Sequence, residues 1–134
     1  MRSLPVTMSG RLKSAMSKGA TSCAAKFTAL TGIASYAMRF ARSATVVEHL
    51  EEITGYATAI GFLAHAVART NQDLKALIGA ATEFPGPGFL LPTRNHDVFE
   101  WCLNCELMLV FQMTLMSTGL YNEPAGAYLP SIRY

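Results

Sequence analysis

Two long apolar runs limit what this 134-residue chain can fold into. The first extends from Val46 to Thr70 and has no Asp, Glu, Lys or Arg between Ile53 and Ala68. The second extends from Trp101 to Tyr121, with Glu106 as its one such charge. Runs of this length are typical of helices that are buried in a core or that cross a membrane. We therefore expect these two runs to organise the fold.

The composition indicates a surface that is covered by other molecules. Charged residues make up only 15% of the chain and apolar residues 51%, whereas a soluble domain has about 25% charged residues. A surface so poor in charge is expected to face lipid, another subunit, or both. The charge is also uneven, because seven basic and no acidic residues precede Glu48.

We expect a first hydrophobic helix over residues 45–70. Thr45 and Glu48 have the spacing of a capping box, and the stretch from Ile53 to Thr70 would cover about 27 Å, enough for a thin bilayer. Small residues recur at a spacing of four, which would let a second helix approach closely; these packing candidates are Gly55, Ala57, Ala59, Gly61, Ala64 and Ala68. A buried helix of a globular core would show the same pattern.

A second hydrophobic helix is expected over residues 96–118. The preceding segment 71–95 contains Pro85-Gly86-Pro87-Gly88 and predicts a loop with a tight turn, so the two helices would form a hairpin. Trp101 and Tyr121 would lie about 30 Å apart along a helix, which suits aromatic residues at the two interfaces of a bilayer. A core helix with flanking aromatics is the alternative.

The remaining segments are basic or irregular. Residues 10–42 combine apolar steps of three and four with Arg and Lys, which predicts a basic amphipathic helix. Such a segment is typical of an organelle transit peptide. We expect a retained helix at an anionic membrane surface, with a solvated helix on its own core as the alternative. The basic residues have few interleaved aromatics, so no nucleic-acid binding is expected.

Both ends of the chain, residues 1–9 and 122–134, contain proline and lack a helical period. We expect extended arms that contact neighbouring subunits, because free tails of this kind are normally disordered. Large apolar and aromatic side chains carry most interface energy. The expected interface anchors are Trp101, Tyr121, Tyr128, Leu129, Ile132 and Tyr134.

Few residues form a pattern that identifies chemistry. Cys102 and Cys105 make one C-x-x-C pair, to which His96 would add a third metal ligand, but a zinc site needs four. A redox pair would need a thioredoxin-like context. His65 is a candidate ligand for haem or a pigment, without a partner histidine on the second run. Buried thiols and a hydrogen-bonded core histidine explain the same residues, so we expect no catalytic site, metal or cofactor.

These patterns predict a single all-α domain with a hairpin of two transmembrane helices, a basic amphipathic N-terminal helix and extended arms. The basic start and the small-residue hydrophobic runs resemble, at the level of a class, small accessory subunits of mitochondrial respiratory or ATP synthase complexes. The resemblance implies a non-catalytic structural subunit of the mitochondrial inner membrane that contacts other subunits and anionic lipid headgroups. A thylakoid membrane is the alternative location.

Two other functions stay open at this point. One is a soluble all-α interaction module that buries its apolar faces against a partner. The other is a small haem-, pigment- or metal-binding membrane protein that uses His65, His96, Cys102 and Cys105.

Overall fold

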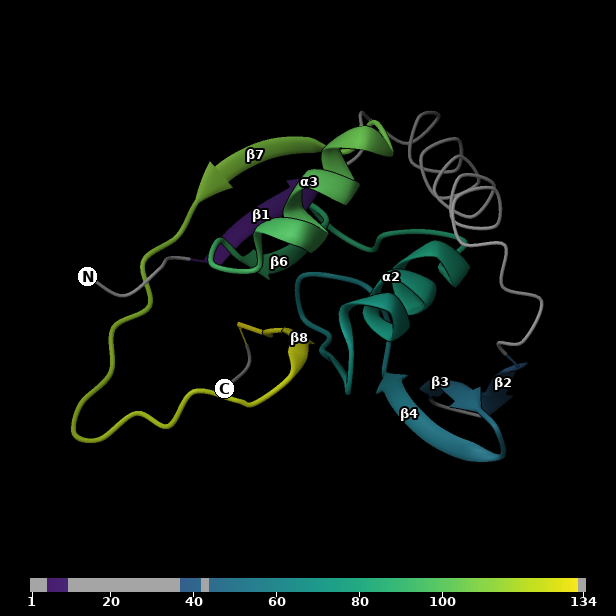
Figure 1. The fold of residues 1–134 in the computed structure, drawn as a ribbon. Coiled ribbons are helices and arrows are strands. Elements are labelled where there is room, and N and C mark those ends of the chain that lie inside the picture. The colour runs from purple at the N-terminus through teal and green to yellow at the C-terminus, as the bar shows by residue number, and fades with distance from the viewer. Residues whose placement is uncertain (1–4, 10–36, 42–43, 133–134) are drawn as a thin grey trace.

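The computed structural model describes residues 5–9, 37–41 and 44–132, with side chains from residue 44 onward. Over these residues the backbone forms two antiparallel sheets and two helices (Figure 1). One sheet has five strands and the other has three.

The five-stranded sheet is built mainly from the first apolar run. In spatial order its strands are β2 (Ala37–Ala41), β3 (Ala44–His49), β4 (Glu52–Ala57), β5 (Ala66–Ala68) and β8 (Ala127–Leu129). Each neighbouring pair is antiparallel. The first four strands follow one another along the chain, whereas β8 returns from the C-terminal region and pairs with β5.

A two-residue turn at Leu50 and Glu51 connects β3 to β4. His49 pairs with Glu52 across the hairpin, and φ is positive at both turn residues, 52° at Leu50 and 67° at Glu51. Two successive positive φ angles are typical of the type I′ turn, whose twist matches that of the flanking strands. The chain therefore reverses direction within the first apolar run.

The three-stranded sheet combines segments that are far apart in the sequence. Its central strand is β1 (Pro5–Ser9), flanked by β6 (Phe89–Pro92) and by β7 (Met108–Gln112). Both pairs are antiparallel. All residues of β6 are buried, whereas all residues of β7 are exposed. Among the described strands, one edge of this sheet is thus closed and the other is open.

Helix α2 (Asn71–Ala80) packs against the five-stranded sheet. Thr70 and Asp73 form a capping box, in which the Thr70 hydroxyl oxygen accepts from the Asp73 N–H and the Asp73 carboxylate accepts from the Thr70 N–H. Leu74, Leu77 and Ile78 are fully buried. The helix contacts β3, β4 and β5, and Figure 1 shows it between β4 and α3.

Helix α3 (His96–Asn104) begins after Asn95, whose side chain accepts a hydrogen bond from the N–H of Val98. It contacts α2 and buries Val98, Trp101 and Cys102. The two helices and the inner faces of the sheets therefore share one core.

The prediction of an all-α fold is wrong. Residues 45–70, expected as the first helix, form β3, β4, β5 and their connections. Thr45, Val46 and Val47 are β-branched and favour a pleated strand. A helix through Gly55 and Gly61 would also lose about 1 kcal/mol at each glycine. Apolar length alone did not separate a long helix from several short strands.

The second predicted helix is helical only in its first half. Residues 96–118 divide into α3, which ends at Asn104, and strand β7. Glu106 lies between them with a φ of 66°, a left-handed conformation that ends helices. The predicted loop 71–95 in turn contains both α2 and β6.

The prediction of free extended arms is wrong for the parts of both ends that pair within the chain's own sheets. Residues 5–9 form the central strand of one sheet, and residues 127–129 form a strand of the other. The basic amphipathic helix predicted over residues 10–42 lies mostly outside the described residues, and residues 37–41 form β2.

The membrane prediction is contradicted as well. Across the described ranges, neither helix has the length and apolar character that a membrane span requires. The longer of the two, α2, has 10 residues, about half of the ~20 needed to span hydrocarbon. This finding overturns the transmembrane hairpin and the integral position in a mitochondrial inner or thylakoid membrane.

Gly126 and Gly119 provide a matched test of how closely β8 approaches β5. Both have positive φ, 81° and 77°, but a Cβ at Gly126 would lie 2.8 Å from the backbone oxygen of Ala68, whereas Gly119 has no heavy atom within 4 Å. We predict that Gly126→Ala lowers the free energy of unfolding by about 2–4 kcal/mol and Gly119→Ala by about 1 kcal/mol. Urea unfolding measures both, and equal losses would contradict this close approach.

Candidate functional site

Strand β7 presents apolar side chains to solvent. Met108, Leu109, Val110 and Phe111 are between 41% and 48% exposed, and Gln112 is exposed as well. A strand that covers a core on one face normally buries every second side chain. Four consecutive exposed apolar residues are therefore a surface that other molecules can cover.

One backbone edge of β7 is also open. The strand pairs with β1 on one side, and no other described strand pairs with its opposite side. The unpaired N–H and C=O groups of such an edge can bind a strand of another chain. Proteins commonly protect an edge with lysine, proline or a β-bulge, and β7 contains a bulge but neither of these residues. We call residues 108–112, with their unpaired backbone groups, the β7 edge.

A β-bulge lies at the middle of this edge. Thr7 of β1 pairs with Phe111 and Met8 pairs with Leu109, so Val110 has no partner on β1. A bulge increases the local twist of a strand and changes the direction of its side chains. This local irregularity is consistent with a strand whose residues are all exposed.

The apolar character continues beyond the strand. Residues 107–122 contain no Asp, Glu, Lys or Arg, and Leu115, Met116 and Leu120 are exposed. In Figure 1 this segment runs along the outside of the molecule before the chain returns as β8. The β7 edge is thus part of a longer uncharged surface segment.

A polar cluster joins the starts of the two helices. Lys75 Nζ donates to Asp97 Oδ1 at 2.8 Å, and Asn71 Nδ2 donates to Asp97 Oδ2 at 3.0 Å. Asn95 Nδ2 donates to Asn71 Oδ1 at 2.9 Å. The hydrogen bond from Lys75 is the main reason that the pKa of Asp97 lies below its ordinary value. Both charged groups of the cluster have partners, so its role is to hold α2 and α3 together.

A second ionic contact fixes the segment before β8. Arg94 forms an ion pair with Glu123 and lies over the ring of Tyr128, with its guanidinium carbon 5.6 Å from the ring centroid. The Tyr128 hydroxyl donates to Glu123 Oε1 at 3.1 Å. Burial, with the negative charge of Glu123 beside it, raises the pKa of Tyr128 to about 12.

The structure places His65 in an apolar hollow. A hydrogen bond of 3.2 Å joins its Nε2 to the Tyr56 hydroxyl, and the two rings meet edge to face. The hollow has a volume of about 400 Å³, and Leu115, Tyr121 and Tyr128 form part of its wall. Its size falls in the range of small-molecule pockets, but among the described residues no three metal-ligating side chains gather there or elsewhere.

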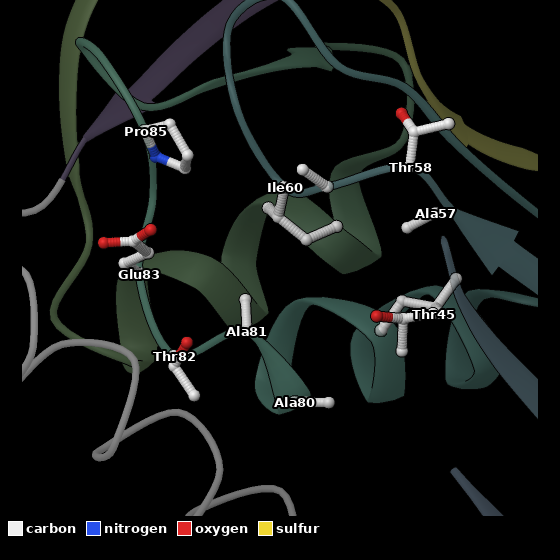
Figure 2. A pocket seen from close by; sticks show the side chains of 11 residues that line it. Thr45, Ala57, Thr58, Ile60, Ala80, Ala81, Thr82, Glu83 and Pro85 are labelled. Carbon is white, nitrogen blue, oxygen red and sulfur yellow. The ribbon is translucent and has the colours of Figure 1, made fainter. Parts of the chain in front are cut away.

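A smaller cavity of about 220 Å³ lies between the end of α2 and the start of the β4–β5 connection (Figure 2). Thr45, Thr58 and Ile60 line it, and Glu83 is its ionisable residue. Figure 2 shows Glu83 across the hollow from Thr58. Among the described lining residues, one carboxylate without a histidine, cysteine or lysine does not make a nucleophile–base pair.

The candidate metal ligands do not come together. Cys102 and Cys105 are fully buried near the end of α3, whereas His96 is exposed at its first position. Burial raises the pKa of the Cys102 thiol well above its ordinary value. A reactive or metal-binding thiol needs the opposite shift, so this geometry favours two structural thiols.

The small residues expected to pack helices lie on strands and in a loop. Gly55 of β4 pairs with Ala68 of β5, and a Cβ at Gly55 would lie 3.0 Å from that of Ala68. Gly61 lies against Pro85, and a Cβ at Gly61 would lie 3.2 Å from the backbone oxygen of Pro85. Ala59 and Ala64 lie in the same β4–β5 connection.

The expected interface anchors divide into three groups. Trp101, Tyr128 and Leu129 are buried in the chain's own core, so little of their surface is left for a partner. Tyr121 is half-buried and Ile132 is exposed, and their anchoring role stays a prediction. Tyr134 lies outside the described residues.

The β7 edge was not predicted from the sequence. Residues 107–111 form a continuous apolar run, and such a run does not distinguish a strand from a buried helix. The absence of charge over residues 107–122 was the available signal, because a solvent-facing strand edge normally carries charge.

Comparisons with protein-family models, with curated proteins and with solved structures found no match.

Asp97 is predicted to make stability depend on pH. Because its pKa is lowered in the folded state, its contribution is complete above the unfolded-state pKa of about 3.9 and is lost as the pH falls through the lower folded-state pKa. We expect Asp97→Asn to lower the free energy of unfolding by about 1 kcal/mol at neutral pH, since solvent screens this half-exposed carboxylate. The loss of stability in acid should also become less steep.

Urea unfolding at neutral pH and in steps below about pH 4 measures both effects. Glu52→Gln is the control, because the Glu52–Arg69 pair has two hydrogen bonds but both side chains are well exposed. We expect a smaller change in that variant. An unchanged acid slope in Asp97→Asn would contradict the role given to the Lys75–Asp97 pair.

The two buried thiols are predicted to be unreactive in the folded chain. In a Cys23→Ser background, iodoacetamide should modify Cys102 and Cys105 about 10-fold or more slowly than in the denatured chain, because the reaction requires local opening. Mass spectrometry at timed intervals follows both sites. Modification at the denatured rate would instead identify an accessible thiolate.

Proposed function

We propose that this chain is a non-catalytic interaction module that binds a partner protein through the β7 edge. The observation that carries the proposal is an outer strand with one unpaired backbone edge and exposed side chains at every position. The proposal keeps the expectation of a subunit within a larger assembly and gives it a specific surface.

The expected mode of binding is the addition of a strand. An extended segment of the partner would pair with the free N–H and C=O groups of β7, and these bonds would supply affinity. Met108, Leu109 and Phe111 would contact the partner's side chains, because cross-strand neighbours lie about 4.5–5.5 Å apart. Uncharged, apolar side chains along the edge favour a partner strand of similar character.

Support for a non-catalytic role comes from the polar groups of the described residues. Lys75 and Asp97 pair with each other, and Arg94 pairs with Glu123. The Cys102 thiol is buried and its pKa is raised. The pKa of Asp97 is lowered and that of the Cys102 thiol is raised, each away from the values that acid–base or nucleophilic catalysis uses.

The proposed partner is a protein. The expected contact with anionic lipid headgroups rests on the basic segment 10–42, most of which lies outside the described residues. The β7 edge itself has no basic residue, so it does not provide the charge that attracts anionic lipid or nucleic acid.

Val110→Lys tests the proposed surface. Val110 is exposed and has no partner on β1, so a lysine at this position places charge on the edge with little effect on the sheet. We predict that the wild-type chain, tagged and gently extracted from its native cells, elutes in an assembly larger than 14.5 kDa. The Val110→Lys chain should elute at the size of the monomer.

Leu50→Lys is the matched control for this experiment. Leu50 is 85% exposed at the β3–β4 turn of the other sheet, so the same change in charge occurs away from β7. This variant should elute with the wild-type assembly. A Val110→Lys chain that also keeps the wild-type assembly would overturn the proposed function.

A further inference from the structure

We propose that the strand that binds the β7 edge is β7 of a second copy of this chain. This inference rests on the proposed function and names its partner. Two copies would meet about a two-fold axis, with the two β7 strands antiparallel. The three-stranded sheets would then join into one sheet with the order β6-β1-β7-β7-β1-β6.

The charge pattern of the segment suits pairing with itself. In an antiparallel self-pairing, each residue before the middle of the strand faces a residue the same distance after the middle. A charged residue near the axis would meet its own copy, and like charges directly opposite are destabilising. Residues 107–122 contain no charge, so this repulsion does not occur.

Glu106 is the nearest charge before the strand, and it also avoids its own copy. With Val110 near the axis, Glu106 lies beside the segment 113–115, which is Met-Thr-Leu. The two Glu106 residues are then separated by most of the length of the paired strands. A partner of different sequence would not require a neutral β7, since an opposite charge on that partner would do as well.

The opposite edge of the sheet explains why the pairing would end at two copies. All residues of β6 are buried and β6 lies against β8, so this edge is closed to another strand. A self-complementary contact that uses one open edge per copy gives a closed dimer.

Two variants with opposite charges at Val110 test this inference with the purified full chain. Val110 is the middle residue of β7, so the two copies of residue 110 lie next to each other across the axis. The wild-type chain should sediment at twice 14.5 kDa. Val110→Lys and Val110→Glu should each dimerise at least about 10-fold more weakly, because like charges then meet.

An equimolar mixture of Val110→Lys and Val110→Glu should dimerise again, since each lysine then meets a glutamate. Leu50→Lys should dimerise as the wild type does. Circular dichroism and the thermal midpoint establish that every variant is folded. A mixture that stays monomeric while both variants are folded would overturn self-pairing.

A cysteine at the axis gives an independent measurement if the charged variants do not fold. In a Cys23→Ser background, Val110→Cys should form a disulfide-linked dimer under mild oxidation, because cross-strand Cβ atoms lie about 4.5–5.5 Å apart. Leu50→Cys in the same background should stay unlinked. Equal cross-linking of the two variants would show random collision and would overturn the inference.

Two further results distinguish a failure of self-pairing from a failure of the proposed function. A purified wild-type chain that is monomeric at all concentrations, with rapid hydrogen exchange in β7, overturns self-pairing. The proposed function then stands if Val110→Lys still disrupts the native assembly. A monomer with slow exchange in β7 indicates that the chain covers its own edge, and this result overturns both.

Discussion

Helix α2 has a sheet on one side and helix α3 on the other, so seven of its ten residues are buried. This placement puts Lys75 in the interior, with 8% of its side chain exposed. A buried ammonium group is costly without a partner, and Asp97 at the start of α3 supplies one. The position of α3 therefore depends on satisfying the charge of a lysine in α2.

The location of β7 follows from that of α3. The chain leaves α3 at Cys105, reverses through the left-handed Glu106, and buries Leu107 before the strand begins. The Leu107 N–H donates to the Cys102 oxygen at 3.1 Å, which ties this residue to the last turn of the helix. Strand β7 is therefore held at its first end by buried residues, and its exposure is a consequence of the fold.

Part of this fold was predictable from the sequence. Asn95 as a cap, a helix after it through Trp101, and a turn at the Pro–Gly segment 85–88 follow from local rules, and the structure has all three. The capping box of Thr70 and Asp73 is a local signal of the same kind, although residues 71–95 were predicted as a loop. These features depend on hydrogen bonds and backbone preferences within a few residues of one another.

The division of the apolar runs into strands was not predictable in the same way. A run such as 53–68 supports a long helix or several short strands, and the choice depends on which surfaces are buried. Here the turn at Leu50–Glu51 uses two residues that rarely adopt positive φ, so its sequence gives no turn signal. The pairing of β1 with β6 and β7 joins residues between 81 and 106 positions apart, which local patterns do not encode.

The segment between β7 and β8 is held in place at both ends, and the fold therefore keeps its apolar side chains at the surface. At one end β7 pairs with β1, and at the other end β8 pairs with β5. The Arg94–Glu123 ion pair and the burial of Tyr128 fix the approach to β8. Because both ends are held, exposed residues such as Leu115 and Met116 cannot retreat into a core that Phe84, Phe89 and Leu91 already occupy. Covering them requires atoms from beyond the described core, and the proposed association would supply those atoms.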